Sequence, residues 1–195
     1  PILKRLASLR VPVALFNRWE SLPNLSCVSP DYERAGRESF QLLQSRGYER
    51  FGFVYRAADE ANWDEMAMAA RYPYVCIRKG FLDAAAAAGT PPRGVLMPDE
   101  VADAARFTDP AAYGLPLKRP ADWRPLGFLA VSDRWAVFLM DAIRRTDLVI
   151  GKDIGVIGCM DLECGRLSRR PPTTWSIDRG AVGELAAKAL IDRIE

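Results

Sequence analysis

Short apolar runs recur along this chain, and most of them are followed by a segment with helical periodicity. The runs are apolar at consecutive positions, which suits strands buried on both faces of a parallel sheet. The runs predicted as strands are residues 11–16, 51–55, 94–97, 127–131 and 154–157. Alternation of strands and helices with room for crossovers is typical of α/β folds. The sequence therefore predicts an α/β fold built on parallel sheets flanked by helices.

Helices are expected where apolar residues line one face of a 3.6-residue period. The predicted helices are residues 32–46, 81–88, a segment that follows Ser132, and about 181 to the end. The Ser132 hydroxyl or the Asp133 carboxylate is expected to cap the third helix. Two long stretches, 57–76 and 107–124, show no clear period and are interpreted as loops, where binding residues often lie.

Composition is that of an ordinary soluble globular chain: 195 residues, 49% hydrophobic, 27% charged, and a formal net charge of +2. That balance offers no basic surplus for nucleic acid or an anionic membrane, so any DNA contact belongs to another part of the protein. No apolar run is long enough to span a bilayer. The four cysteines form no CxxC pair and are expected to pack as small apolar residues in a reducing, cytoplasmic setting.

Histidine is absent from the chain, which removes Ser–His and Cys–His catalysis and the commonest zinc ligand. No nucleophile elbow, P-loop or dinucleotide fingerprint occurs, so no catalytic residue, cofactor or metal is predicted. Asp and Glu are plentiful, and a carboxylate pair for glycoside cleavage keeps a sugar-processing enzyme open as an alternative. Binding is favoured over catalysis.

Four stretches, taken in order, carry a family resemblance. They are VPVALFNR (11–18) with 29–31 and GRESFQLLQSRGYERFGFV (36–54); RKGFLDA (78–84) up to Gly89; LAVSD (129–133) with IGVIG (154–158); and PPTTW (171–175) with Gly183, Ala186, Ala187 and Leu190. This order resembles the periplasmic-binding-protein-like sensor domain of LacI/GalR transcription regulators. It is also similar to the same module in xylose-type activators of the AraC class.

The resemblance implies two α/β lobes that face each other across a cleft. Residues 1–31 and 161–195 would form the first lobe, incomplete in this chain, and residues 32–160 the second. A small sugar or polyol would bind between the lobes of a cytoplasmic homodimer and control DNA binding by a region absent here. A solute-binding protein of a sugar transporter, which shares the fold, is the alternative.

A polyol site needs charged or amide side chains for hydroxyl groups, set in a cleft that can close. The resemblance implies ligand contacts at Ser132 and at Asn17, where the family often has aspartate. The family's arginine and acidic positions fall one residue before Arg78 and Asp161, which are the predicted counterparts. A turn-forming Asn17, a surface Arg78 and a helix-capping Ser132 are the structural alternatives.

An aromatic side chain commonly stacks on the apolar face of a sugar ring. Trp19, Trp63 and Phe107 fall in predicted loops and are the candidates for this role.

Overall fold

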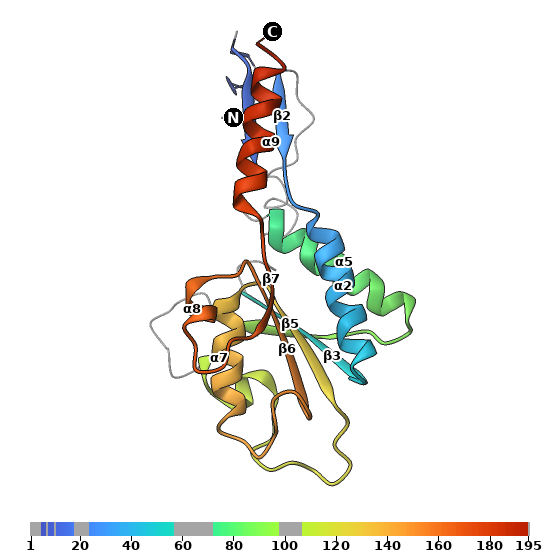
Figure 1. Ribbon diagram of the computed structural model, residues 1–195. Helices are drawn as coiled ribbons and strands as arrows, with labels where there is room; N and C mark the ends of the chain where they lie inside the picture. Colours follow the sequence, from blue (N-terminus) through green and yellow to red (C-terminus); the bar gives the residue numbers. More distant parts are fainter. Residues whose placement is uncertain are drawn as a thin grey trace. The chain divides into compact units, whose positions relative to one another are not determined.

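The computed structural model describes residues 5–6, 8–9, 11–17, 24–56, 72–97 and 107–194. These residues fall into two compact units, which we describe separately. The smaller unit comprises residues 1–31 and 177–195, and the larger unit comprises residues 32–176. The colours of Figure 1 follow the chain through both units.

The larger unit contains a five-stranded sheet in which every pairing is parallel. Its strand order is β4 (Arg93–Met97), β3 (Arg50–Arg56), β5 (Leu126–Ala130), β6 (Ile154–Cys159) and β7 (Thr173–Trp175). Every residue of β5 and β6 is buried, as predicted for strands covered on both faces. β3 is the first strand of this sheet along the chain, with β4 on one side of it and β5, β6 and β7 in turn on the other, which is the α/β arrangement that the sequence predicts.

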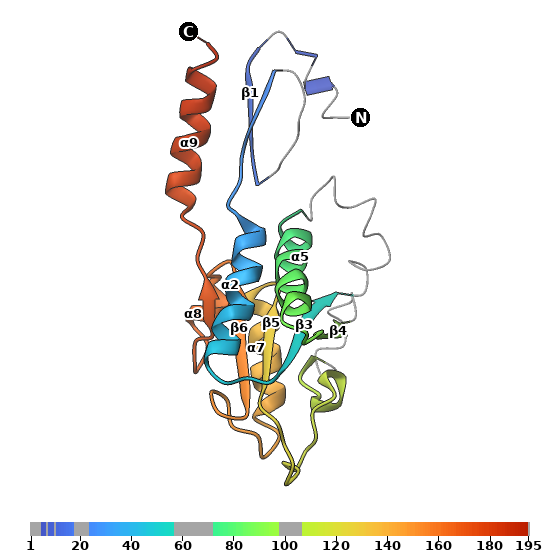
Figure 2. The ribbon, with the colours of Figure 1, turned by 90° about the vertical axis from the view of Figure 1, so that its right-hand side faces the viewer.

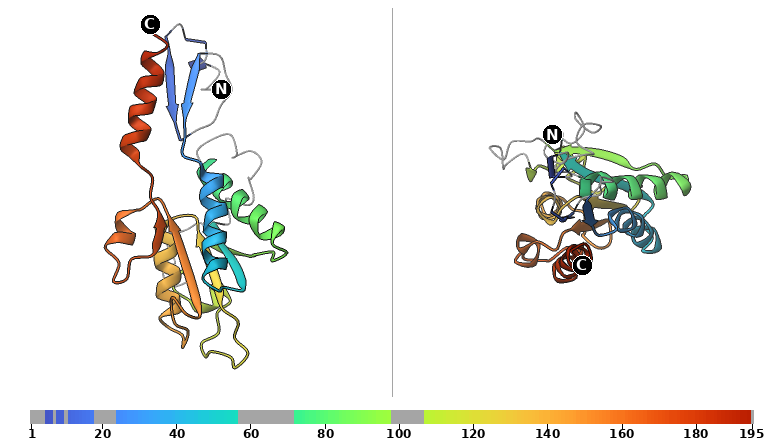
Figure 3. Two further views of the ribbon diagram at one scale, coloured as in Figure 1. Left: turned by 45° about the vertical axis from the view of Figure 1, so that its right-hand side comes forward. Right: turned by 90° about the horizontal axis from the view of Figure 1, so that it is seen from above.

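Helices cover both faces of this sheet. Helices α2 (Tyr32–Ser45) and α5 (Tyr72–Ala87) pack against each other in front of the sheet in Figure 2, and α7 (Asp133–Ile143) lies behind it. The short α8 (Glu163–Arg166) packs beside α7, as Figure 3 shows. The core under α2 and α5 is aromatic: the Phe40 ring lies 4.6 Å from that of Phe51 and 5.9 Å from that of Phe81.

The smaller unit consists of a parallel pair of strands and one helix. Strand β1 (Val13–Phe16) pairs with β2 (Leu25–Val28), and α9 (Arg179–Ile191) packs on both. Asp178 caps α9 by accepting a hydrogen bond from the Ala181 N–H at 2.9 Å. None of the helical residues of α9 is fully buried.

Four features differ from the sequence prediction. Helix α5 begins at Tyr72, although residues 72–76 were interpreted as loop; Pro73 is tolerated there because the first turn needs no N–H from it. Strands β2 and β7 were missed because four and three residues are too few to show a period. Residues 161–176 were assigned to the first lobe, yet they belong to the larger unit because β7 pairs with β6.

Two further observations concern the surface and the cysteines. Within the described residues, no helix is long and apolar enough to cross a membrane. Cys76 and Cys159 are buried, as predicted for small apolar residues, whereas Cys27 is half-buried and Cys164 is exposed.

We predict that Ser39→Ala lowers the free energy of unfolding by about 1–2 kcal/mol. The buried Ser39 hydroxyl accepts a hydrogen bond from the Trp175 indole N–H at 2.8 Å and lies 2.7 Å from the Ala35 carbonyl. Alanine would leave the indole N–H without an acceptor. Urea denaturation measures the change, with Ser45→Ala as control because that hydroxyl bonds a local carbonyl on an exposed helix end. Equal effects of the two substitutions would contradict the assignment.

Candidate functional site

The strands of the larger unit run parallel, so their carboxyl ends meet at one side of the sheet. Register brings Val54 opposite Ala130, Leu129 opposite Ile157, and Cys159 opposite Trp175. Polar side chains lie directly after β5 and β6, and within and directly after β7. We call residues 131–133, 160–162 and 174–176 the carboxyl edge; this is where open α/β sheets bind their ligands.

Ser132 leaves β5 with an extended backbone (φ −155°, ψ 160°) and occupies the N-cap position of α7. Its side chain makes no capping hydrogen bond, and the Asp133 carboxylate is turned away from the helix, so the capping prediction is wrong. In the described part of the chain no polar atom is both fully buried and unbonded, and the Ser132 hydroxyl has no partner. Ser132 is 7% exposed, so its unbonded hydroxyl has only slight access to solvent.

Asp133 is fully buried and ties the edge together. One carboxylate oxygen accepts a hydrogen bond from the Thr174 hydroxyl and the other from the Leu162 N–H, each at 2.5 Å. Burial raises the pKa of the Asp133 carboxyl, and the two hydrogen bonds oppose that rise. Gly158 lies so close that a Cβ there would come within 2.1 Å of an Asp133 oxygen. Asp133 thus holds the segment after β6 against β7.

Asp161 stands in a strained turn directly after β6. Met160 (φ 90°) and Asp161 (φ 50°) both adopt positive φ, which non-glycine residues rarely do. The turn is held on both sides, because the Met160 N–H bonds the Trp175 carbonyl at 2.9 Å and the Leu162 N–H bonds Asp133. Strain of this kind persists where surrounding contacts enforce it and is frequent at functional sites.

Arg166, which sequence reasoning did not single out, forms a bidentate ion pair with Asp161. Its Nε lies 2.8 Å from Oδ1 and its Nη2 lies 2.6 Å from Oδ2, while the Ser176 hydroxyl donates to Oδ2 at 3.1 Å. The Asp161 side chain is 20% exposed and that of Arg166 is 62% exposed. The hydrogen bonds and negative charge of Asp161 raise the pKa of Arg166. The pair places the hydrogen-bond donors of the Arg166 guanidinium beside the acceptor oxygens of the Asp161 carboxylate.

Arg78 lies in the second turn of α5, and its guanidinium sits over the Tyr55 ring, 5.1 Å from the centroid. Tyr55 is the penultimate residue of β3, so this cation–π contact places Arg78 near the carboxyl end of that strand. Ile77, where the family's spacing would put the arginine, is buried and its carbonyl faces Gly36 of α2. Ile77 is therefore part of the contact between α2 and α5, whereas the Arg78 side chain contacts β3.

The remaining predicted residues are Asn17, Phe107, Trp19 and Trp63. Asn17 follows β1 in the smaller unit, with φ 57° and its N–H bonded to the Val28 carbonyl at 2.9 Å. Phe107 is fully buried, stacked on Phe138 at 5.2 Å and edge-on to Trp135, so its predicted ligand-stacking role is wrong: both neighbours already cover the ring. Trp19 and Trp63 lie outside the described residues.

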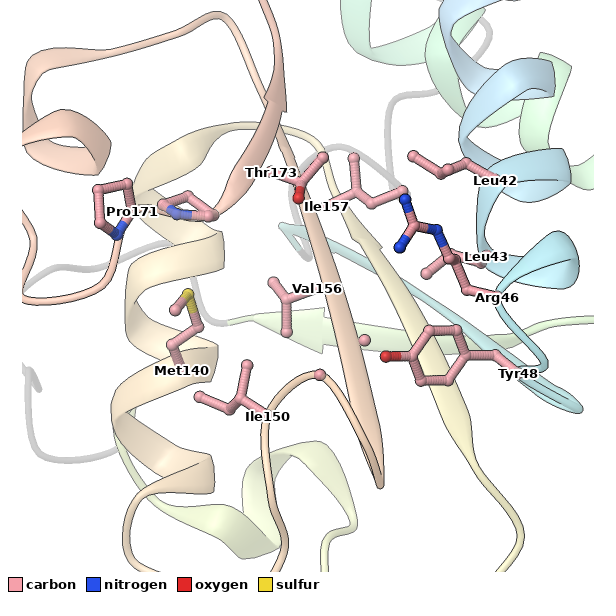
Figure 4. A pocket seen from close by; sticks show the side chains of 13 residues that line it. Leu42, Leu43, Arg46, Tyr48, Met140, Ile150, Val156, Ile157, Pro171 and Thr173 are labelled. Atoms are coloured by element: carbon pink, nitrogen blue, oxygen red, sulfur yellow. The ribbon is translucent and has the colours of Figure 1, made fainter.

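A cavity of about 480 Å³ lies beside β6 between α2 and α7, and Figure 4 shows the side chains that line it. Its walls include Leu42, Tyr48, Met140 and Val156, and none of the predicted ligand residues. We therefore place the candidate site at the carboxyl edge and not in this cavity. Among the described residues no cluster of acidic or cysteine side chains could hold a metal ion.

Comparison with known proteins identifies the fold family. Residues 40–195 match the model of the periplasmic binding protein-like domain. The arabinose metabolism transcriptional repressor of Geobacillus stearothermophilus is 24% identical over 191 residues, which cover 97% of this chain and 49% of that protein. The chain thus spans about half the length of this curated relative.

Several solved structures share the fold. A LacI family regulator from Silicibacter pomeroyi superposes with a TM-score of 0.74 at 18% identity, covering 98% of this chain and 66% of that one. A LacI family regulator from Enterococcus faecium, solved with bound ribose, has a TM-score of 0.67 at 20% identity, covering 94% and 62%. The resemblance to AraC-class activators receives no support from these relatives. The chain belongs to the periplasmic binding protein-like domain family.

Proposed function

We propose that this chain is the ligand-sensing domain of a bacterial transcription regulator, and that it binds a small sugar or polyol without chemical turnover. The observation that carries the proposal is the carboxyl edge, where the unbonded Ser132 hydroxyl and the Asp161–Arg166 pair follow adjacent strands. The strained turn at Asp161 is the kind of feature that surrounding structure maintains for binding.

The chemistry of this edge suits neighbouring hydroxyl groups. A carboxylate accepts hydrogen bonds from two hydroxyls, and the guanidinium of Arg166 donates to oxygens in the same plane. Ser132 both donates and accepts, and Arg78 would supply further donors from the β3 side. An edge with paired opposite charges favours a neutral, hydroxyl-rich molecule.

The relatives support a regulator over the alternatives. The curated relative is named a repressor of arabinose metabolism, and one structural relative binds ribose. Neither named relative is a transporter component, which favours a cytoplasmic regulator over a solute-binding protein. DNA binding through a region outside this chain, and pairing into a homodimer, are parts of the same proposal.

Ligand binding would act through the connections between the two units. Ser176, the last residue of the larger unit, donates its hydrogen bond to the same Asp161 oxygen that Arg166 contacts. A ligand that competes for this oxygen would alter the start of the connection to the smaller unit, to which Asn17 belongs. Such a ligand shifts the arrangement only by its different affinity for the open and closed states.

We predict that one monosaccharide among pentoses and hexoses raises the melting temperature of the protein, and that Asp161→Asn abolishes the rise. At 100 times Kd the shift should be about 5–10 °C for a chain of this size. Ser132→Ala should weaken binding by roughly 10-fold, the loss of one hydrogen bond. Asp83→Asn is the matched control, because it changes an exposed carboxylate on α5 that pairs with Lys79.

Two results would overturn the proposal. One is a sugar-induced shift that is the same in Asp161→Asn as in the unchanged protein. The other is conversion of the sugar to a new product, which mass spectrometry of the incubated mixture would reveal.

A further inference from the structure

A second cavity, of about 330 Å³, lies in the larger unit at the carboxyl-terminal end of α7. Ser132 lies at the amino-terminal end of the same helix. The cavity is formed by the turn after α7 and by the loop that precedes β7. Its lining residues are Ile143, Arg144, Thr146, Leu148, Val149, Ile150, Arg169 and Arg170. We propose that this cavity binds a small molecule that carries a phosphate group, independently of any sugar at the carboxyl edge.

The charge of the cavity is the first argument. Arg144 is paired with Asp141, but Arg169 and Arg170 form no ion pair with any carboxylate of the described residues. The two segments that build the cavity, 143–152 and 167–170, also carry Arg145 and Lys152, against the carboxylate of Asp147. The next carboxylate along the chain, Asp153, is paired with Arg119 and accepts the Val149 N–H. A chain with a net charge of only +2 therefore concentrates positive charge at this cavity.

The backbone that carries the two exposed arginines is also held in place. The Ser168 hydroxyl lies 2.8 Å from both the Gly165 and the Arg170 carbonyl oxygens, which fastens the loop to the end of α8. Pro171 and Pro172 follow, and a proline restricts the residue before it to extended conformations. Loop ordering thus adds little to the entropic cost of binding.

The turn after α7, which also lines the cavity, is tied by hydrogen bonds of its own. The Thr146 hydroxyl bonds the Ile143 carbonyl at 2.7 Å and accepts the Leu148 N–H at 3.0 Å, which closes the turn. Ile143 and Leu148 are buried and give the cavity an apolar floor, while Val149 is half exposed.

These features together select the ligand class. A phosphate group accepts hydrogen bonds from two guanidinium forks at once and neutralises their charge, which a neutral sugar does not do. The apolar floor suits carbon atoms attached to that group. The cavity volume lies at the lower end of the range for small-molecule sites, about 300–1,000 Å³, so a phosphorylated metabolite of sugar size fits the site better than a larger nucleotide.

The test is titration calorimetry of the whole chain with pyrophosphate, inorganic phosphate and glucose 6-phosphate, at constant ionic strength in sodium chloride. Glucose serves as the uncharged partner of the sugar phosphate. We expect binding of the phosphorylated probes, weakened at least about 10-fold in Arg169→Gln/Arg170→Gln. The matched control is Arg37→Gln/Lys118→Gln, which removes the same charge from exposed positions that line neither cavity.

Equal loss of affinity in both double variants would show a general charge effect and overturn the proposal, as would unchanged affinity in Arg169→Gln/Arg170→Gln. Absence of binding by all three phosphorylated probes would overturn it as well. We expect Asp161→Asn to bind the phosphorylated probes with unchanged affinity. Because this substitution should remove sugar binding, that result would separate the phosphate site from the sugar site.

Discussion

Gly80→Ala should destabilise the larger unit by about 4 kcal/mol or more, the largest effect that we expect from a one-carbon change in this chain. A Cβ at Gly80 would stand 1.9 Å from the Glu33 carbonyl oxygen. The reverse approach is equally tight, because a Cβ at Gly36 would stand 2.0 Å from the Ile77 carbonyl oxygen. Helices α2 and α5 touch through their backbones at two glycines.

The direction of the effect depends on which of two opposing terms is larger. Alanine favours a helix over glycine by about 1 kcal/mol, so propensity alone would make the substitution stabilising. The clash is with backbone atoms, which have no rotamer through which to move away. The helices must separate, and the aromatic core beneath them, including Phe40 and Phe81, loses its packing.

Urea denaturation followed by circular dichroism measures the change. Gly183→Ala is the matched control, because this glycine lies within α9 and a Cβ there would meet no atom within 4 Å. The control should be neutral or stabilising by up to about 1 kcal/mol. Destabilisation of less than 1 kcal/mol by Gly80→Ala would contradict the helix contact described above.

Asp133→Ala is expected to lower the free energy of unfolding by about 2–4 kcal/mol. The substitution leaves the half-buried Leu162 N–H and Thr174 hydroxyl without the acceptor that the buried Asp133 provides. The turn at Asp161 then loses one of its two attachments, so sugar binding should weaken together with stability. Asp133 thus supports the geometry of the carboxyl edge through its two hydrogen bonds.

Asp133→Asn separates shape from charge. An amide oxygen still accepts from Leu162, and the amide N–H₂ donates to the Thr174 oxygen. Burial raises the pKa of Asp133 above its ordinary value of 3.8. The stability that the protonated carboxyl contributes is therefore present below that value and is lost as the pH rises through the folded-state pKa.

The stability of Asp133→Asn relative to the unchanged protein should consequently increase as the pH rises from about 4 to 7. Denaturation midpoints across this range measure the trend, and Asp178→Asn, a change at the exposed cap of α9, serves as control. A trend of opposite sign would mean that the hydrogen bonds outweigh burial and hold the carboxylate ionised.

Much of the fold is predictable from local pattern. Consecutive apolar residues in 127–131 and 154–157 indicate β5 and β6, because strands covered on both faces need no polar alternation. The stripe in 32–46 indicates α2 to within one residue. Local pattern failed at Tyr72–Cys76, where aromatic residues and a proline concealed the start of α5, and at β7, whose three residues depend on pairing with β6.

The candidate site was predictable only in part. Ser132 and Asp161 follow buried strands, so their arrival at one edge is a consequence of parallel topology. Nothing in the spacing of Asp161 and Arg166 indicates an ion pair, because the two residues lie on a strained turn and a short helix. Phe107 looked available because its segment has no period, whereas α7 supplies the two rings that cover it.

By itself, the sequence determined most of the longer strands and helices and that the sheets are parallel, since hydrophobic period and run length are local properties; β2, β7 and the start of α5 were not determined in this way. The tertiary structure alone decided the partners: Arg166 for Asp161, Thr174 and Leu162 for Asp133, and the backbone of α2 for Gly80. Those partners come from segments separated along the chain. A side chain's hydrogen bonds and burial depend on what folding brings beside it, which no local period records.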